Sequence, residues 1–398
     1  MSRIRPEDRR PAGPSALARQ LHQVGSRELE IRIAAGTDLT GDLLKVSGGP
    51  SVPLPPHVVA AAHRAILEPG SRPSRGLLAL RSAIAARIVR EWDGTGVDPE
   101  REILVTNGAM EALNIVFRSL FEPGDRVVLP SPTFFFDGPL RLAGAEPVYV
   151  PGSAAEDWTW QIDDIGRAID SRTQAILICN PTNPTGVLPS REDLAAILRL
   201  AEEHDLIVIS DESYDRFAYD GRAFVSAGSL APDRGRVVVV NSLSKSHALA
   251  TWRMGYVVAS AGLVDTFTRL LEWEHLHGPY VAQCVAAAAL DGPQDWILTE
   301  IARYERSRDI VSDAVAHSPL LEARTPRAGP FLFVDVSRFD SPRTPADIAL
   351  LRAGIPTVRG EYFGQPGYVR LPFGADDATI QRLAERLRGF DPRAAPTS

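Results

Sequence analysis

The amino-acid sequence predicts an α/β fold with two domains: a large domain with a mostly parallel sheet between helices, and a smaller α+β domain. Two observations predict this fold. Short apolar strands alternate with helical segments from residue 102 to residue 241, and this alternation ends before a different pattern begins after residue 290. Apolar strands between helices are typical of a parallel sheet covered on both faces. The length of 398 residues also favours more than one core.

The first predicted segment is an N-terminal arm over residues 1–45, which begins rich in Arg, Pro and Ser and allows a short helix over Ala16–Val24. The large domain is predicted over residues 46–290 and opens with a glycine- and proline-rich loop. Helices are expected at His57–Glu68, Leu77–Arg90, Ala109–Phe121, Gly138–Ala143, Ile162–Ile169 and Arg191–His204. Strands are expected at Glu102–Thr106, Arg126–Leu129, Glu146–Val150, Ala175–Cys179, Leu206–Ser210 and Val237–Asn241.

The small domain is predicted over residues 291–398, and part of the N-terminal segment is expected to complete it. Its elements mix both periodicities without the regular alternation of the large domain. Helices are expected at Ile297–Val315, Pro345–Ala353 and Ala378–Arg388, and strands at Phe331–Val336 and Gly367–Leu371.

Composition bounds the possible partners and the location of the protein. The chain is 44% hydrophobic and 23% charged, with a net charge of −7, which is typical of a soluble globular protein and argues against broad contact with nucleic acid. Cys179 and Cys284 are too few for a disulfide scaffold. The N-terminus lacks the apolar core of a signal peptide, and no apolar run approaches the ~20 residues that span a bilayer. A cytoplasmic protein without membrane contact is therefore expected.

The cationic residues single out a candidate nucleophile. Lys and Arg together number 43, yet Lys45 and Lys245 are the only lysines. An arginine stays protonated and cannot form an imine, whereas a desolvated lysine can. Lys245 follows a predicted strand in the sequence Ser-Leu-Ser-Lys and lies eight residues before Arg253. A lysine for the imine, with hydroxyls and a guanidinium for a phosphate, suits a phosphate-bearing aldehyde cofactor. Lys45 has no comparable set of hydroxyl and arginine residues near it in the sequence, and it is expected at the surface.

Further polar groups are expected at the carboxyl ends of the strands, where such sheets bind ligands. Asp211 follows a strand directly and could pair with a protonated pyridine nitrogen. Asn183 lies in a proline-stiffened loop after the strand Ala175–Cys179, and the segment Thr106–Met110 joins a strand to a helix start that suits phosphate. Phe134 could stack on a cofactor ring, and Arg370 in the small domain could grip a substrate carboxylate.

These motifs resemble those of the class I/II aminotransferases, a fold-type-I family that depends on pyridoxal phosphate. The resemblance covers nearly the whole chain, from Val46 to Phe373. Its specific segments are Asn-Pro-Thr-Asn-Pro-Thr-Gly at residues 180–186, Asp-Glu-Ser-Tyr at 211–214, and Ser-Leu-Ser-Lys at 242–245 with Arg253. It implies the aspartate-aminotransferase-like fold, with a mostly parallel seven-stranded sheet in the large domain, and a homodimer with active sites at the interface.

The resemblance also implies a role for each matching residue. Lys245 would form the Schiff base and move the α-proton, with Asp211 and Tyr214 as the other catalytic residues. The implied cofactor-binding residues are Ala109, Met110, Phe134, Asn183, Asp211, Tyr214, Ser242, Lys245 and Arg253. The implied substrate-binding residues are Gly48, Asn183 and Arg370, and the substrates would be an L-amino acid and a 2-oxo acid.

The chain departs from the family pattern at two positions. The family usually has a tyrosine about five residues before the equivalent of Gly76, where it reaches the phosphate of the neighbouring subunit's cofactor. No aromatic residue stands there, so Ser71 or Arg72 would have to take over that contact. Thr251 stands where a glycine is often found.

Alternative functions share the same residues. Carbanion chemistry on the same cofactor could end as a C–S β-lyase, a decarboxylating deaminase or an oxidase, and a non-catalytic pyridoxal-phosphate-binding sensor is a further alternative. About 45 residues before the match leave little room for a DNA-binding domain. His275 and His277 lack a third ligand at suitable spacing, so no metal site is predicted.

Overall fold

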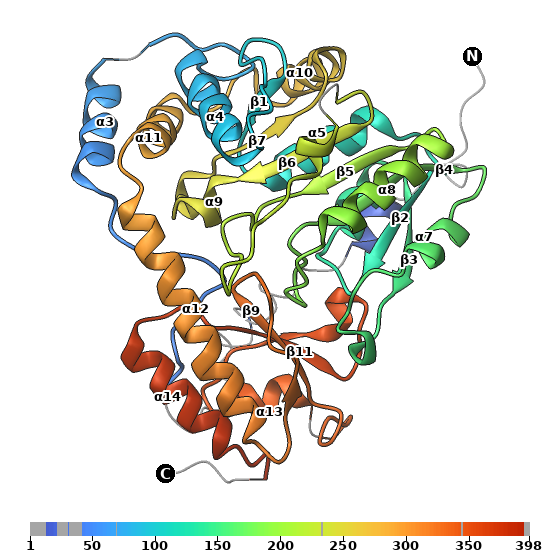
Figure 1. Ribbon diagram of the computed structural model, residues 1–398, viewed down its shortest axis with the longest axis vertical. Helices are drawn as coiled ribbons and strands as arrows, with labels where there is room; N and C mark the ends of the chain where they lie inside the picture. The colour runs from blue at the N-terminus through green and yellow to red at the C-terminus, as the bar shows by residue number, and fades with distance from the viewer. Residues whose placement is uncertain are drawn as a thin grey trace.

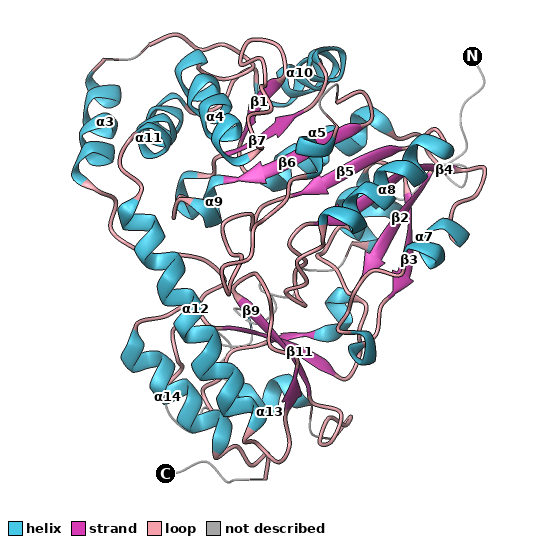
Figure 2. Cartoon of the chain, in the orientation of Figure 1, coloured by secondary structure: helices cyan, strands magenta, loops and turns pink. Residues whose placement is uncertain are grey.

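The computed structural model of the chain describes residues 13–21, 31, 42–68, 70–231, 234–343 and 345–393. A layered region with a large sheet lies above a smaller region in Figure 1, and the cartoon in Figure 2 shows helices on both sides of the large sheet. Within the expected arm, helix α1 covers Ala16–Gln20 and is capped by the Ser15 hydroxyl. Residues 22–24 of the helix suggested by the sequence lie outside the described residues.

The large sheet contains seven strands in the order β1-β7-β6-β5-β4-β2-β3. The strands are β1 Ile103–Thr106, β2 Arg126–Ser131, β3 Glu146–Pro151, β4 Thr173–Cys179, β5 Ile207–Asp211, β6 Val237–Ser242 and β7 Gly255–Val258. All neighbours pair in parallel except β7, which runs antiparallel to both β1 and β6. The predicted mostly parallel seven-stranded sheet is therefore confirmed, while β7 is a strand that the sequence pattern did not place.

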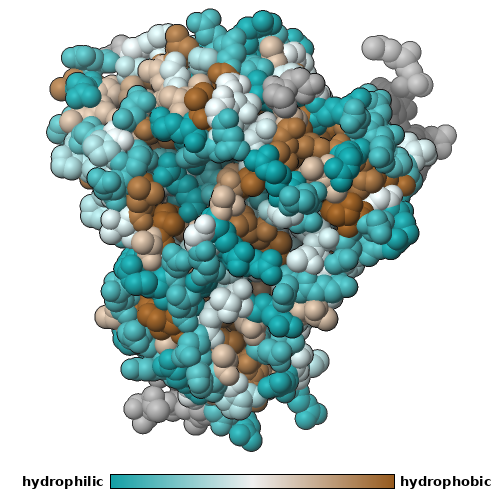
Figure 3. Space-filling view, viewed as in Figure 1, coloured by the Kyte–Doolittle hydropathy of each residue, from teal (hydrophilic) through white to brown (hydrophobic). Residues whose placement is uncertain are grey.

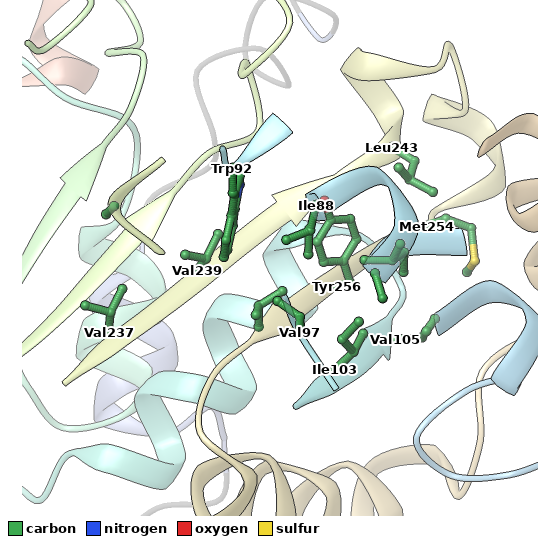
Figure 4. Packing of buried hydrophobic residues seen from close by; sticks show 14 of the residues in the cluster. Ile88, Trp92, Val97, Ile103, Val105, Val237, Val239, Leu243, Met254 and Tyr256 are labelled. Carbon is green, nitrogen blue, oxygen red and sulfur yellow. The ribbon is translucent and has the colours of Figure 1, made fainter. Parts of the chain in front are cut away.

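Successive residues of the strands face opposite layers, which explains why the strands are apolar throughout. On one face, Val237, Val239 and Tyr256 pack in a cluster with helices α4, α8 and α11, at Leu78–Glu91, Arg191–Glu203 and Tyr280–Asp291. On the other face, Val238 and Val240 pack in a cluster with α5, α6 and α10, at Ala109–Leu120, Asp137–Leu142 and Ala261–His275. Figure 4 shows the first cluster, with Ile88 and Trp92 close to the strand residues.

Three further helices and several short turns complete the large region. Helix α3 covers Pro56–Leu67, α7 covers Ile162–Arg167 and α9 covers Leu243–Ser246. The 3-10 turns are at Ala154–Glu156, Ala227–Leu230 and Ala250–Trp252. Helices α9, α10 and α11 were not expected from the sequence. The expected helices of both regions form within one or two residues of their expected bounds.

The smaller region is an antiparallel sheet of four strands, in the order β10-β11-β9-β8, with helices on one side. Its strands are β8 Glu322–Ala323, β9 Phe331–Asp335, β10 Val358–Arg359 and β11 Tyr368–Pro372. Its helices are α12 Asp295–Ala316, α13 Ala346–Arg352 and α14 Asp377–Arg388, with a 3-10 turn at Gly360–Phe363. Figure 1 shows α12 in orange running from the upper region into the lower one.

Residues that precede the large sheet also contribute to the smaller region. Leu44 is buried in the same apolar cluster as the small sheet and α14. The backbones of Ser47 and Gly374 form an isolated antiparallel bridge, and Arg386 donates to Asp42. These contacts join residues 42–47 to the smaller region, whereas the division into residues 1–45, 46–290 and 291–398 stays a prediction.

The surface in Figure 3 is mostly hydrophilic on the face that it draws, with hydrophobic side chains in separate patches. Among the described residues, none of the helices combines the length and the apolar character that a membrane span requires.

Candidate active site

A cavity of about 470 Å³ lies where strand ends of the large sheet face the small sheet. Ligand sites of small molecules commonly have this size. Ten of the residues that the sequence singled out line it: Gly48, Ala109, Met110, Phe134, Asp211, Tyr214, Ser242, Lys245, Arg253 and Arg370. Asn183 does not line the cavity but bonds to Arg370, which does.

Sheet topology explains this convergence. Strands β2, β4, β5 and β6 are parallel, so their carboxyl ends share one edge of the sheet. Asp211 ends β5, Ser242 ends β6, and Phe134 follows the end of β2. Strand β7 contributes Gly255 to the same edge, where it lies opposite both Thr106 of β1 and Ser242.

Lys245 lies in the one-turn helix α9, which begins after Ser242, whose hydroxyl accepts from the Ser244 amide. Its half-buried Nζ makes no hydrogen bond or ion pair with any described residue. Gly49 lies against the lysine so closely that a Cβ there would stand 2.6 Å from the Lys245 Cδ and 3.1 Å from Nζ. Burial, reinforced by the charges of Arg370 and Arg253, lowers the pKa of Lys245 to about 8. The lysine is therefore an unpaired amine that is readily deprotonated.

Asp211 is 5% exposed, and its carboxyl group accepts hydrogen bonds from one residue, Ser213. Its Oδ1 accepts from the Ser213 amide at 3.0 Å and from the Ser213 hydroxyl at 2.6 Å. Burial raises the pKa of Asp211 to about 6, although the two bonds from Ser213 act in the opposite direction. No cation pairs with this carboxyl among the described residues, so it is suited to receive a cationic group of a ligand.

Arg253 lies at the amino end of helix α5. Its Nη1 donates to the Ser244 hydroxyl at 3.4 Å and to the Ala250 carbonyl at 3.1 Å. Gly108, at φ +85°, comes so close that a Cβ there would lie 2.4 Å from Nη2 of Arg253. Free backbone N–H groups at a helix start, a guanidinium and serine hydroxyls together suit a phosphate.

Asn183 connects the two regions of the chain. It is 1% exposed, and its Oδ1 accepts from Nη1 of Arg370 at 3.0 Å. Its Nδ2 lies 3.5 Å from the Tyr214 hydroxyl, to which it donates. Burial raises the pKa of Tyr214, with the charge of Arg370 opposing this. Tyr214 therefore holds its proton at neutral pH.

Three aromatic rings surround the Arg370 guanidinium. Its Cζ lies 4.1 Å from the Phe331 ring centroid, 4.9 Å from that of Phe363 and 5.8 Å from that of Phe135. Arg370 makes no ion pair with a described carboxylate, and its buried Nε has no hydrogen-bond partner. Burial lowers its pKa to about 10. The Arg370 guanidinium is thus held in place by ring faces and has donors without partners among the described residues, so it is suited to bind a carboxylate.

The loop at Gly48 closes the cavity on the side of the small sheet. A Cβ on Gly48 would lie 2.3 Å from Cε1 of Phe331, so this position requires glycine. The Ser47 hydroxyl donates to the Gly49 carbonyl at 2.7 Å and fixes the turn. The loop thus passes between the Phe331 ring and Lys245.

Other residues that the sequence highlighted lie outside the cavity. Ser71 and Arg72 are exposed, and Lys45 is exposed as expected. His275 ends helix α10 and bonds to Glu111 at 2.9 Å, and the described residues contain no cluster of His, Cys, Asp and Glu able to hold a metal. Among the aromatic residues, Phe134 and Phe135 line the cavity, whereas Trp158 belongs to the core and Trp273 is 91% exposed.

Sequence reasoning missed several lining residues. Ser213 lies inside a motif that the sequence identified, so its contact to Asp211 could have been expected. Phe331, Thr357 and Val358 carry no local signal, because they reach the cavity through the packing of the small sheet.

The chain is similar in sequence and in fold to known aminotransferases. Residues 47–387 match the family model described as "Aminotransferase class I and II". An aspartate aminotransferase from Geobacillus stearothermophilus is 31% identical over 367 residues, which cover 90% of this chain and 92% of the relative. An aspartate aminotransferase structure from Rhizobium meliloti, 24% identical, has the same fold, with a TM-score of 0.88 and coverage of 96% and 99%. An alanine aminotransferase from Pyrococcus furiosus, 29% identical, has a TM-score of 0.87 over 95% and 99%.

Proposed function

This chain belongs to the class I and II aminotransferases, and we propose that Lys245 binds pyridoxal 5'-phosphate as a Schiff base at the centre of the cavity. The enzyme is an aminotransferase that moves the α-amino group of an L-amino acid to a 2-oxo acid. The unpaired, half-buried amine of Lys245, with its pKa of about 8, is the observation that carries the assignment.

The residues present fit this cofactor at both of its ends. Arg253, Ser242 and the backbone amides of Ala109 and Met110 would hold the phosphate at the start of α5, where Gly108 lies against Arg253. At the other end, Asp211 would receive the ring nitrogen. Phe134 would lie against the ring, while Asn183 and Tyr214 would bond to its phenolic oxygen.

Bound pyridoxal phosphate supplies an electron sink for the carbanion that forms at the substrate α-carbon. Asp211 keeps a positive charge on the ring nitrogen, because a carboxylate beside a cation favours its protonated form. When it is not bound to the cofactor, Lys245 would be a neutral base whose Nζ would take up the α-proton and later return it. Tyr214 remains a hydrogen-bond donor throughout, since its pKa is raised by burial.

Arg370 and Asn183 would bind the α-carboxylate of the substrate, together with the backbone of Gly48. Asn183 holds Nη1 of Arg370 in place, so the remaining N–H donors of the guanidinium are left for the carboxylate. Fixing the carboxylate would orient the α-C–H bond toward Lys245, which would favour deprotonation over loss of the carboxylate.

The first experiment would trap the cofactor on its lysine. The protein is loaded with pyridoxal phosphate, reduced with borohydride and digested, and the modified peptide is located by mass spectrometry. Lys245 is expected to carry the adduct. Lys245→Ala should show no cofactor absorbance band and no adduct, whereas Lys45→Ala, the matched control, should retain both. An adduct on Lys45 alone would refute the assignment.

The second experiment separates transamination from the alternative reactions. A single half-reaction with an L-amino acid, without any 2-oxo acid, is expected to convert the cofactor stoichiometrically to its amine form. Release of ammonia, thiol, carbon dioxide or peroxide with the cofactor unchanged would favour a lyase, a deaminase or an oxidase. The relatives named above are aminotransferases, which gives these alternatives and a non-catalytic sensor no support.

We further propose a cytoplasmic homodimer with active sites at the subunit interface. Because the chain lacks the usual tyrosine near residue 71, Ser71 or Arg72 would approach the partner's phosphate. Both side chains are exposed and free to do so. Weaker cofactor retention by Arg72→Ala, with an unchanged dimer in analytical ultracentrifugation, would support this role.

A further inference from the structure

We infer, on the premise of the proposed function, that the amino-acid substrate carries an uncharged and mainly apolar side chain. Among the described residues of this chain, the cavity offers one guanidinium to a substrate carboxylate, and the wall around it is apolar apart from the hydroxyls of Ser47 and Thr357. The relatives named above act, by their names, on aspartate in two cases and alanine in the third, so family membership leaves the side chain undetermined.

The charged side chains that line the cavity are few. Among the described residues they are Asp211, Lys245, Arg253 and Arg370. Lys245 forms the covalent link in the proposed function, and Arg253 lies beside Gly108 and Ser244 at the phosphate end. Arg370 alone remains for the substrate, and the α-carboxylate takes it. A second carboxylate would be buried without a cationic partner from the described residues of this chain, which is strongly unfavourable. In the proposed dimer, Ser71 or Arg72 of the partner subunit would lie at the phosphate and not at the wall around Arg370.

The wall around Arg370 is apolar. In the small sheet Val358 lies directly opposite Arg370 on the neighbouring strand, so the two side chains share a face. The rings of Phe331, Phe363 and Phe135 surround the guanidinium on the other sides. The apolar residues that line the cavity on this side are Val46, Phe134, Phe135, Phe331, Pro356 and Val358.

Two hydroxyls interrupt this wall, of which Ser47 donates to the Gly49 carbonyl whereas Thr357 has no such partner among the described residues. Thr357 is 3% exposed, and its Oγ1 is buried. A lone hydroxyl can satisfy one polar atom of a substrate, but it does not neutralise a carboxylate. Aliphatic, thioether and aromatic side chains are therefore compatible with the site.

Cations just outside the cavity do not supply a partner for a second substrate carboxylate. A neighbouring groove shares Val46, Ser47 and Pro356 with the cavity and contains Lys45 and Arg303. Arg303 bonds to Glu300, and Asp376 and Asp377 also line the groove, so acidic groups outnumber basic ones there. Arg359, next to Val358, bonds to Glu361 at 2.6 Å.

The test compares unreactive analogues that lack the amino group and differ only in the side chain. Binding of 4-methylpentanoate, 3-phenylpropanoate and succinate to the cofactor-loaded protein is measured by isothermal titration calorimetry. The two monocarboxylates are expected to bind at least about tenfold more tightly than succinate. In single half-reactions, the second-order rate constant for L-leucine or L-phenylalanine should be larger than that for L-aspartate or L-glutamate by a similar factor.

Two variants at position 357 test the role of charge. Thr357→Lys places a cation in the wall and should raise the affinity for succinate relative to 4-methylpentanoate by about tenfold or more. Thr357→Met, of similar length and without charge, should not. Tighter binding of succinate and faster reaction of aspartate in the wild type would overturn the inference while leaving the aminotransferase function intact. Failure of every amino acid to convert the cofactor would instead overturn the proposed function, and the inference with it.

Discussion

The Oδ1 atom of Asn183 accepts a hydrogen bond of 3.0 Å from the Arg370 guanidinium, although 187 positions of sequence separate the two residues. Asn183 belongs to the loop after β4 in the large sheet, and Arg370 lies in β11 of the small sheet. The bond therefore joins the two regions at the site of the proposed substrate carboxylate. It also uses one donor of a guanidinium that pairs with no described carboxylate.

Arg370→Met should lower kcat/KM by about 100-fold, mainly through a rise in KM, because it removes a bidentate charged contact to the substrate. Steady-state kinetics on the preferred amino acid checks this. Arg308→Met is the matched control, since Arg308 is also buried and also faces an aromatic ring, Tyr219, but lies outside the cavity. A fall of similar size in kcat/KM of Arg308→Met would mean that the loss in Arg370→Met comes from impaired folding and not from substrate binding.

Asn183→Ala should act through Arg370 and through Tyr214, whose hydroxyl it also contacts. In a double-mutant cycle of Asn183→Ala and Arg370→Met, the effects on kcat/KM should be non-additive, with a coupling energy of about 0.5–3 kcal/mol. Additive effects would mean that the Asn183–Arg370 bond does not serve substrate binding.

Asp211 should make the cofactor-free protein sensitive to pH. Its pKa is about 6 in the folded protein and 3.8 as the reference value, so the folded state binds more protons than the unfolded state between these pH values. Stability therefore falls as pH rises from about 4 to about 6. Two pH units correspond to about 3 kcal/mol. The Tm of Asp211→Asn should rise relative to wild type across this window, as measured by scanning calorimetry.

Loading with pyridoxal phosphate should reverse this difference. A cationic ring nitrogen beside Asp211 favours the charged carboxylate and lowers its pKa. The wild type should then be the more stable protein at neutral pH, because it retains the cofactor more tightly. An identical pH dependence with and without cofactor would contradict contact between Asp211 and the ring.

Lys245 should capture the cofactor with a pH dependence centred near its pKa of about 8, because only the neutral amine attacks the aldehyde. Stopped-flow absorbance of cofactor-free protein mixed with pyridoxal phosphate measures the rate at each pH. Arg370→Met should move the midpoint upward, since it removes a positive charge that disfavours the protonated amine. A midpoint near the ordinary lysine value in the wild type would contradict burial of this amine.

The buried ion pair of Arg87 and Asp215 should contribute to stability rather than to chemistry. Arg87 is 1% exposed and donates through Nη2 to Asp215, which also accepts from Asn241 Nδ2 at 2.8 Å. Arg87→Met leaves Asp215 buried without its cation and should cost about 3–5 kcal/mol in urea unfolding. Arg236→Met removes an exposed pair with Asp205 and should cost no more than about 1 kcal/mol.

Much of the fold could be predicted because its determinants are local. Apolar strands and amphipathic helices, such as Val237–Ser242 and Leu78–Glu91, carry their periodicity in short stretches of sequence. Polar motifs directly after strands then locate a site, because the ends of parallel strands meet at one edge. Strand β7 escaped this reasoning: it has four residues, and its antiparallel position between β1 and β6 depends on pairing partners far away in the sequence.

The sequence by itself singled out Lys245 as the candidate nucleophile, and it also carried the alternation of strands and helices and the resemblance to one enzyme family. Only the tertiary structure decided which residues surround Arg370, how Asn183 links to it, and that Thr357 and Val358 complete the wall of the cavity. The reason is physical. Backbone periodicity and motifs at strand ends are set by neighbours in sequence, whereas the composition of a cavity between two sheets is set by side chains that packing brings together from distant segments.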